Sequence, residues 1–172
     1  AVTVVTFILV LGIVVWTLSK RCSADFEEAA KLPNLQCEIL ATDIADKVIE
    51  RAKKGLYSQF EIQRGLPINL LIKYFKQQAD NNWEVSDQLK QMVKFQNVNL
   101  LSPFTFLGSF EIIFCRNVLI YFDDKTKSDV LDRMADILVP GGYLLLGSAE
   151  SVFGLTKKFV PLEEARGVFV KA

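Results

Sequence analysis

A short apolar run that ends abruptly in polar residues constrains the fold of this chain more than any other feature. Ile112, Ile113 and Phe114 are consecutive and β-branched or aromatic, which is typical of a parallel strand covered on both faces. Arg116 and Asn117 follow almost at once. Ligands of open α/β sheets bind beyond the carboxyl ends of the strands, so these two side chains are candidates for contact with a small molecule. An ion pair for Arg116 and a turn for Asn117 are equally good readings of the local sequence.

Strand-like and helix-like segments alternate along the sequence from residue 35 onward. Alternation of this kind predicts a mostly parallel, doubly wound α/β sheet. A closing pair of short strands is expected at the end of the chain. The expected strands are residues 37–43, 83–85, 93–98, 112–114, 143–146, 159–162 and 167–170, and the helices between them begin near residues 44, 67, 86 and 123.

Two further strands are also followed by polar residues. Asp43 comes at the end of the strand over residues 37–43, where nucleotide-binding folds place a carboxylate that accepts hydrogen bonds from ribose hydroxyls. Asn99 follows the strand over residues 93–98, and its amide can read the edge of an adenine while the leucine after it packs against the face of the ring. The alternatives are a helix N-cap for Asp43 and a simple turn for Asn99.

Residues 2–18 carry no charge. As a helix they would extend roughly 25 to 27 Å, close to the hydrocarbon thickness of a bilayer. Trp16 would then lie at the membrane interface, and Lys20 with Arg21 would keep the following domain on the cytoplasmic side. We therefore expect residues 1–19 to form a transmembrane helix that anchors a cytoplasmic domain. The alternative is a buried central strand of the sheet.

Composition excludes several classes of function. The 20 basic and 20 acidic residues balance and are interleaved, so nothing indicates a nucleic-acid partner. Histidine is absent, which removes imidazole bases and most zinc chemistry. The three cysteines lack metal-ligand spacing and fit a reducing compartment, so no metal site is expected.

Five motifs in the same order make the chain resemble the CheR-type chemotaxis receptor methyltransferases. They are residues 39–44, 57–67, 99–101, 114–123 and 140–143. The resemblance implies a Rossmann-like, class I S-adenosylmethionine-dependent methyltransferase that produces glutamate methyl esters on receptors. A glutamate is already ionised at neutral pH, so such transfer needs no general base.

The resemblance also implies roles for individual residues. Asp43 would hold the ribose of S-adenosylmethionine, Asn99 and Leu100 the adenosine, and Arg116 with Asn117 the rest of the donor. Tyr121 would lie near the departing methyl group. The expected catalytic residues are therefore Arg116 and Tyr121, and the expected partners are the cytoplasmic helices of chemotaxis receptors.

The domain boundaries follow from the same comparison. Residues 20–34 are expected to be a connector and residues 35–172 the methyltransferase domain, with residues 57–90 as a small inserted subdomain that contacts the receptor. The family's first strand and its glycine-type loop find no match before residue 35, so both are expected to be missing or replaced in a chain truncated on its N-terminal side. A catalytically inactive module that binds a receptor or another partner is the alternative function.

Overall fold

One mixed sheet dominates the computed structural model, which describes residues 2–7, 37–63 and 66–172. Within these residues the strand order is β6-β2-β1-β7-β8-β10-β9. The strands are β1 Val2–Phe7, β2 Cys37–Asp43, β6 Val93–Asn97, β7 Phe110–Cys115, β8 Leu138–Leu146, β9 Phe159–Pro161 and β10 Val168–Lys171.

The sheet is doubly wound, as expected. Strands β6, β2, β1, β7 and β8 pair in parallel, whereas β10 is antiparallel to both β8 and β9. From β1 the strand order proceeds through β2 to β6, and β7 then lies on the other side of β1. The direction of winding therefore reverses between β1 and β7. In open α/β sheets such a switch point is the place where a ligand crevice forms.

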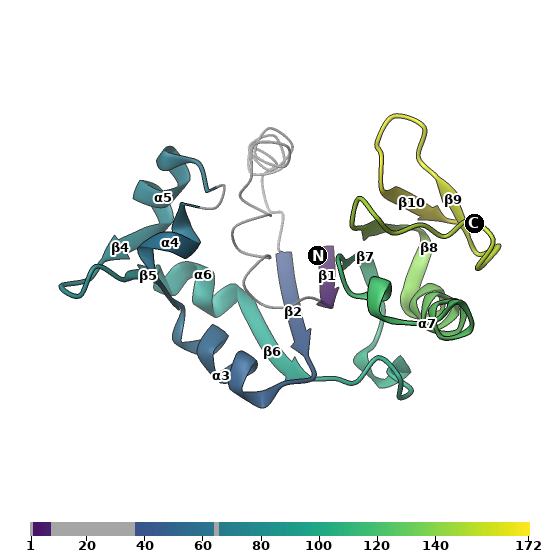
Figure 1. Cartoon of the computed structure of the whole chain (residues 1–172), viewed down its shortest axis with the longest axis horizontal. Coiled ribbons are helices and arrows are strands. Elements are labelled where there is room, and N and C mark those ends of the chain that lie inside the picture. Colours follow the sequence, from purple (N-terminus) through teal and green to yellow (C-terminus); the bar gives the residue numbers. More distant parts are fainter. Residues whose placement is uncertain (1, 8–36, 64–65) are drawn as a thin grey trace.

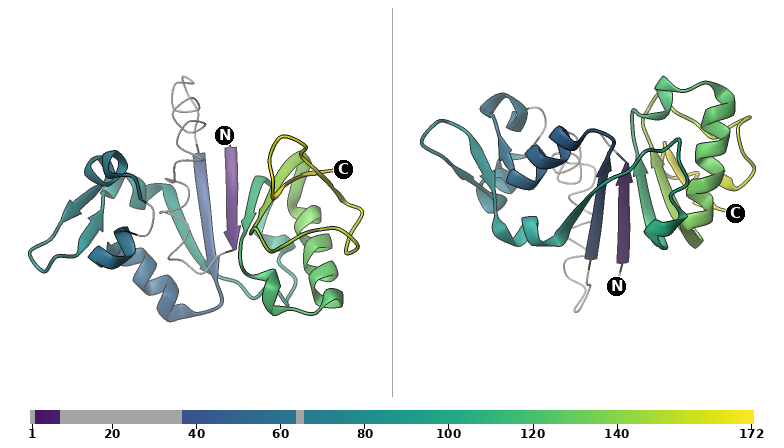
Figure 2. Two further views of the ribbon diagram at one scale, coloured as in Figure 1. Left: turned by 45° about the horizontal axis from the view of Figure 1, so that its top comes forward. Right: turned by 90° about the horizontal axis from the view of Figure 1, so that it is seen from below.

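Strand β1 corrects the prediction of a transmembrane helix. Val2–Phe7 pair with β2 on one side and with β7 on the other, and Figure 2 shows β1 and β2 side by side, running in the same direction. The helix prediction is therefore wrong for these residues. Without β1, the inner backbone groups of β2 and β7 would lack partners in the middle of the sheet, which is costly.

Strand β1 also bears on the expectation that the family's first strand is missing or replaced. The first strand of the sheet is present and is supplied by the charge-free N-terminal run. The remainder of that run, the expected connector over residues 20–34 and the rest of the segment between β1 and β2 lie outside the described residues. Among the residues that are described, no helix is both long and apolar enough to span a bilayer.

Local sequence signals position the two helices that flank the parallel strands. α3 Asp46–Lys54 ends at Gly55, whose φ of 65° suits a residue without a side chain. α7 Asp124–Ile137 begins after Asp123, and the Asp123 carboxylate accepts a hydrogen bond of 2.8 Å from the Thr126 N–H. β8 then starts directly after α7, so Pro140 lies within the strand and not in a separate turn.

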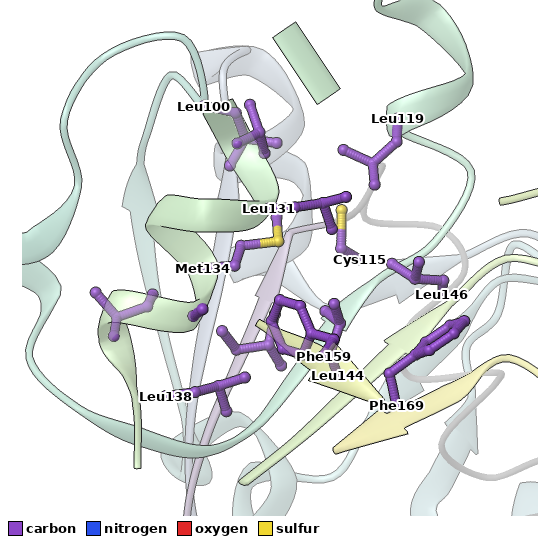
Figure 3. Close-up of a cluster of buried hydrophobic side chains, with 14 of the residues drawn as sticks. Leu100, Cys115, Leu119, Leu131, Met134, Leu138, Leu144, Leu146, Phe159 and Phe169 are labelled. Atoms are coloured by element: carbon purple, nitrogen blue, oxygen red, sulfur yellow. The ribbon is translucent and has the colours of Figure 1, made fainter. Parts of the chain in front are cut away.

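The main hydrophobic core lies between α7 and the strands around it. Figure 3 shows Leu131 and Met134 of α7 in one cluster with Leu144 of β8 and Phe159 and Phe169 from the antiparallel strands. Leu131, Met134 and Leu144 are fully buried. Truncation of such a side chain to alanine typically costs about 2 to 5 kcal/mol, so this cluster is a major source of stability.

A second, smaller sheet lies at the opposite end of the molecule from α7 (Figure 1). It has the order β3-β5-β4 and a separate core, which contains Tyr57, Ile62 and Leu71. Its elements, with the helices on either side, are β3 Leu56–Tyr57, α4 Gln59–Ile62, α5 Ile68–Tyr74, β4 Phe75–Gln77, β5 Trp83–Val85 and α6 Asp87–Met92. This sheet falls in the region where the inserted subdomain is expected, and the domain boundaries themselves stay a prediction.

The central position of β1 leads to the first testable prediction. Thr6 is opposite Ala41 on one side and Phe114 on the other. Thr6→Pro removes one N–H from the ladder and leaves a carbonyl of a neighbouring strand unpaired, which should lower the free energy of unfolding by roughly 2 to 4 kcal/mol. Thr6→Ala, which keeps the N–H, is the control. Equal unfolding free energies for the two variants in urea titrations would contradict a central β1.

Candidate functional site

Strand register brings the candidate residues to one edge of the sheet. Phe7 is opposite Thr42 of β2 and also opposite Cys115 of β7. Asp43 and Arg116 therefore each lie one residue beyond a strand position paired with Phe7. Two strand spacings separate them, about 10 Å. A ligand that crosses the end of β1 would meet a carboxylate on one side and a guanidinium on the other.

Asp43 is half-buried at the end of β2, and part of its hydrogen-bonding capacity is used locally. Its Oδ1 accepts a hydrogen bond of 2.8 Å from the Ala45 N–H, and no described residue donates to Oδ2. The N-cap of α3 is Ala45, so Asp43 is not the helix cap that the sequence allowed. Asn97 stabilises the turn between β2 and α3. Its Nδ2 donates to the Ile44 carbonyl at 2.9 Å and to Asp46 Oδ1 at 2.7 Å.

Asn99 and Leu100 follow the neighbouring strand β6. Asn99 forms a turn in which its Oδ1 accepts a hydrogen bond of 2.9 Å from the Leu101 N–H. The side-chain Nδ2 of Asn99 has no acceptor among the described residues. Leu100 is 8% exposed and belongs to the main core, so it offers a ligand little side-chain surface. Leu101, by contrast, is exposed.

Arg116, Asn117 and Tyr121 share the loop after β7. Arg116 is half-buried and Asn117 is exposed, with a φ of 60° that asparagine tolerates better than most residues. Tyr121 ends the short 3-10 helix Leu119–Tyr121 and is exposed. The register places Asp43 and Arg116 at the same level of the sheet, whereas Tyr121 lies five residues further along the loop.

Sequence reasoning missed the residue that holds this loop. Glu150, which follows β8, accepts hydrogen bonds from the backbone N–H groups of Asn117, Val118 and Leu119 at 2.8, 2.9 and 2.7 Å. It also accepts one from Gly147 at 2.7 Å. The available signal for this role in the sequence was an acidic residue just beyond strand β8, next to a turn. The contacts themselves connect residues about 30 positions apart, which no local pattern reports.

Cys115, the last residue of β7, lies directly beneath the loop and is fully buried. Burial raises the pKa of the Cys115 thiol well above its usual range, and the negative charge of Glu150 acts in the same direction. The thiol is therefore protonated at neutral pH and is not a nucleophile. Nor do the described residues contain a group of histidine, cysteine, aspartate or glutamate side chains that could hold a metal ion.

Comparison with known proteins agrees with this arrangement. Residues 16–168 match the model of a family described as CheR methyltransferase, SAM binding domain. That description confirms S-adenosylmethionine as the expected cofactor. The chain is 43% identical over 133 residues to a chemotaxis protein methyltransferase of Vibrio parahaemolyticus, covering 77% of this chain and 48% of that protein.

A second chemotaxis protein methyltransferase, from Borreliella burgdorferi, is 41% identical over 122 residues, covering 70% of this chain and 43% of that protein. The chain thus spans about half the length of the curated relatives it matches.

Solved structures support the fold. The N-methyltransferase NodS of Bradyrhizobium japonicum, in complex with S-adenosyl-L-homocysteine, superposes with a TM-score of 0.55 at 15% identity, covering 98% of this chain and 76% of NodS. TrmN from Thermus thermophilus gives a TM-score of 0.56 at 14% identity, covering 99% of this chain and 44% of TrmN. Together with the family match, these likenesses confirm the Rossmann-like, class I methyltransferase sheet.

Cys115 provides a test of the packing beneath the loop. In the folded protein at neutral pH, we expect iodoacetamide to modify Cys115 far more slowly than it modifies glutathione, because burial keeps the thiol protonated and inaccessible. In urea the rates should become similar. Peptide mass spectrometry identifies the modified cysteine. Native-state labelling of Cys115 at the glutathione rate would contradict the buried environment.

Proposed function

The chain belongs to the CheR methyltransferase family, and on this premise we propose that it transfers the methyl group of S-adenosylmethionine to glutamate side chains of chemotaxis receptors. The products would be glutamate methyl esters and S-adenosylhomocysteine. The observation that carries the proposal is the switch point between β1 and β7, where the strand register brings Asp43 and Arg116 of two family motifs to one sheet edge.

The chemistry suits a chain without histidine. S-adenosylmethionine supplies a sulfonium-activated methyl group: a glutamate oxygen forms the new C–O bond while the S–CH₃ bond breaks and its electron pair stays on sulfur. The attacking glutamate is ionised at neutral pH, so no residue needs to remove a proton. The remaining tasks of the protein are to align the two reactants and to exclude water.

We assign these tasks as follows. Asp43, whose Oδ2 receives no hydrogen bond from a described residue, accepts the ribose hydroxyls of the donor. Asn99, with its Nδ2 available among the described residues, contacts the adenine edge next to Leu100. Arg116 on the far side of β1 meets a carboxylate, and Asn117 contacts the donor beside it. Tyr121 approaches the methyl group from the same loop.

The small sheet is the proposed contact with the receptor. It has its own core and lies away from α7 and the C-terminal strands, so it can dock without disturbing the main sheet (Figure 1). Exposed apolar side chains of Phe60, Ile68 and Ile72 lie on its helices. Anchoring through residues 2–18 forms no part of the proposal, because residues 2–7 are β1.

The activity is tested with methyl-tritiated S-adenosylmethionine and the cytoplasmic fragment of a receptor. Label should enter the receptor and should leave as volatile methanol in alkali, which distinguishes a methyl ester from N-methylation. A receptor fragment with its glutamates replaced by alanine is the control. Binding of the receptor without transfer of label would favour the inactive module.

Asp43 provides a sharper test of the donor site. In Asp43→Asn the remaining side-chain oxygen can still accept from Ala45, so we expect little change in melting temperature. Loss of the charged acceptor for the ribose should weaken binding of S-adenosylhomocysteine about 10- to 100-fold, as measured by calorimetry.

Asp46→Asn is the matched control for this variant. Asp46 lies in the first turn of α3 and accepts a hydrogen bond from Asn97, a contact that an asparagine oxygen can also accept. The two substitutions remove the same charge from neighbouring positions. Equal losses of affinity would show that charge alone matters, and unchanged affinity in Asp43→Asn would remove this residue from the donor site.

A further inference from the structure

Glu150 accepts more backbone hydrogen bonds than a cap or a turn requires. Its Oε1 receives the N–H groups of Val118 and Leu119 at 2.9 and 2.7 Å, with Ile120 further away at 3.4 Å. Its Oε2 receives those of Asn117 and Gly147 at 2.8 and 2.7 Å. All five donors are backbone groups, and four of them belong to consecutive residues of the loop after β7.

The backbone of that loop is shaped to surround an anion. Asn117 has a φ of 60°, whereas Val118 has φ −116° and ψ −46°, in the right-handed helical region. Adjacent residues of opposite hand turn successive N–H groups toward one side of the chain, which makes an anion-binding concavity. In this loop the anion comes from the same chain, about 30 residues downstream.

Gly147 completes the arrangement by allowing the two loops to approach. A Cβ at this position would lie 2.6 Å from Glu150 Oε2 and 3.0 Å from the Asn117 N atom. The contact with Glu150 is too close for a real Cβ atom, so the carboxylate would have to move, and the contact with Asn117 is tighter than most Cβ contacts. Any other residue at position 147 would therefore separate the carboxylate from the loop that it holds.

The side chains of the loop are divided between the core and the surface. Leu119 is buried, but Asn117, Ile120 and Tyr121 are exposed. Val118 and Phe122 also pack against the main core. Hydrophobic packing therefore holds one side of the loop, and the hydrogen bonds to Glu150 orient the backbone N–H groups of residues 117–120. These hydrogen bonds are charge-assisted and hence stronger than neutral ones.

We propose that Glu150 is the positioning residue of the donor site, holding the loop that carries Asn117 and Tyr121 directly after Arg116. This inference rests on the proposed function. It also narrows how the donor can be held. The N–H groups of residues 117–119 are already used by Glu150, so this concavity is not available to the carboxylate of the donor.

Glu150→Gln tests the role with the shape of the side chain preserved. An amide keeps one oxygen and presents its NH₂ to N–H groups on the other side. At least two of the backbone hydrogen bonds to residue 150 are then lost whichever way the amide lies, and at least one of them comes from the loop after β7. We expect amide exchange of residues 117–119 to become about tenfold faster or more, and S-adenosylhomocysteine to bind roughly 10- to 100-fold more weakly. Exchange within α7 should not change.

Two further variants complete the experiment. Glu163→Gln removes the same charge from an exposed turn and should change neither quantity. Gly147→Ala keeps the charge but inserts a Cβ between Glu150 and Asn117, so it should reproduce both effects, and it is the substitute if Glu150→Gln does not fold. All measurements are made well below the melting temperature of each variant.

The outcomes separate this role from a purely structural one. Faster loop exchange together with weaker ligand binding supports the proposal. Faster loop exchange with unchanged affinity overturns it, because Glu150 would then order the loop without serving the site. Unchanged exchange in both variants overturns it as well. If the wild-type chain binds no S-adenosylhomocysteine while the loop responds as described, the proposed function fails, and the positioning role fails with it.

Discussion

The two-sided pairing of β1 is the constraint on which the site depends. β2 and β7 carry Asp43 and Arg116, and these strands are related to each other only through β1 between them. If β1 were shifted by one residue against β2 or β7, Asp43 or Arg116 would move along the sheet edge relative to β1. Side chains that share a face across that pair of strands would then lie on opposite faces. The separation between carboxylate and guanidinium is therefore a property of strand register more than of the loops.

Much of the fold could be predicted from the sequence because its signals are local. The strand over residues 37–43 was predicted with its observed bounds, and the helix after Asp123 begins where a capping residue precedes an amphipathic pattern. Other local signals were misleading. The helix expected to begin near residue 86 is α6, but the Ser86 side chain makes no capping hydrogen bond. The helix expected to begin near residue 44 is α3, which starts at Asp46 and leaves Ile44 64% exposed.

The larger errors concern interactions that sequence patterns do not record. A charge-free run has the same hydropathy whether it crosses a bilayer or lies between two strands, so residues 2–7 could not be assigned from composition. The role of Glu150 could not be predicted for a related reason. Its partners are backbone N–H groups, which every residue but proline carries, so nothing in the side chains of residues 118–120 indicates that a carboxylate is bound there.

The pairing of β1 with β7 also has a consequence for how the chain acquires its structure during synthesis. Phe7 and Cys115 are paired although roughly a hundred residues separate them. At ordinary rates of translation, β1 leaves the ribosome on the order of ten seconds before its second neighbour exists. In that interval one edge of the apolar strand is open to other nascent chains or to a chaperone. The contacts at the centre of the sheet join residues that are far apart in the sequence. We therefore expect this domain to be most exposed to aggregation early in folding, before β7 has been synthesised.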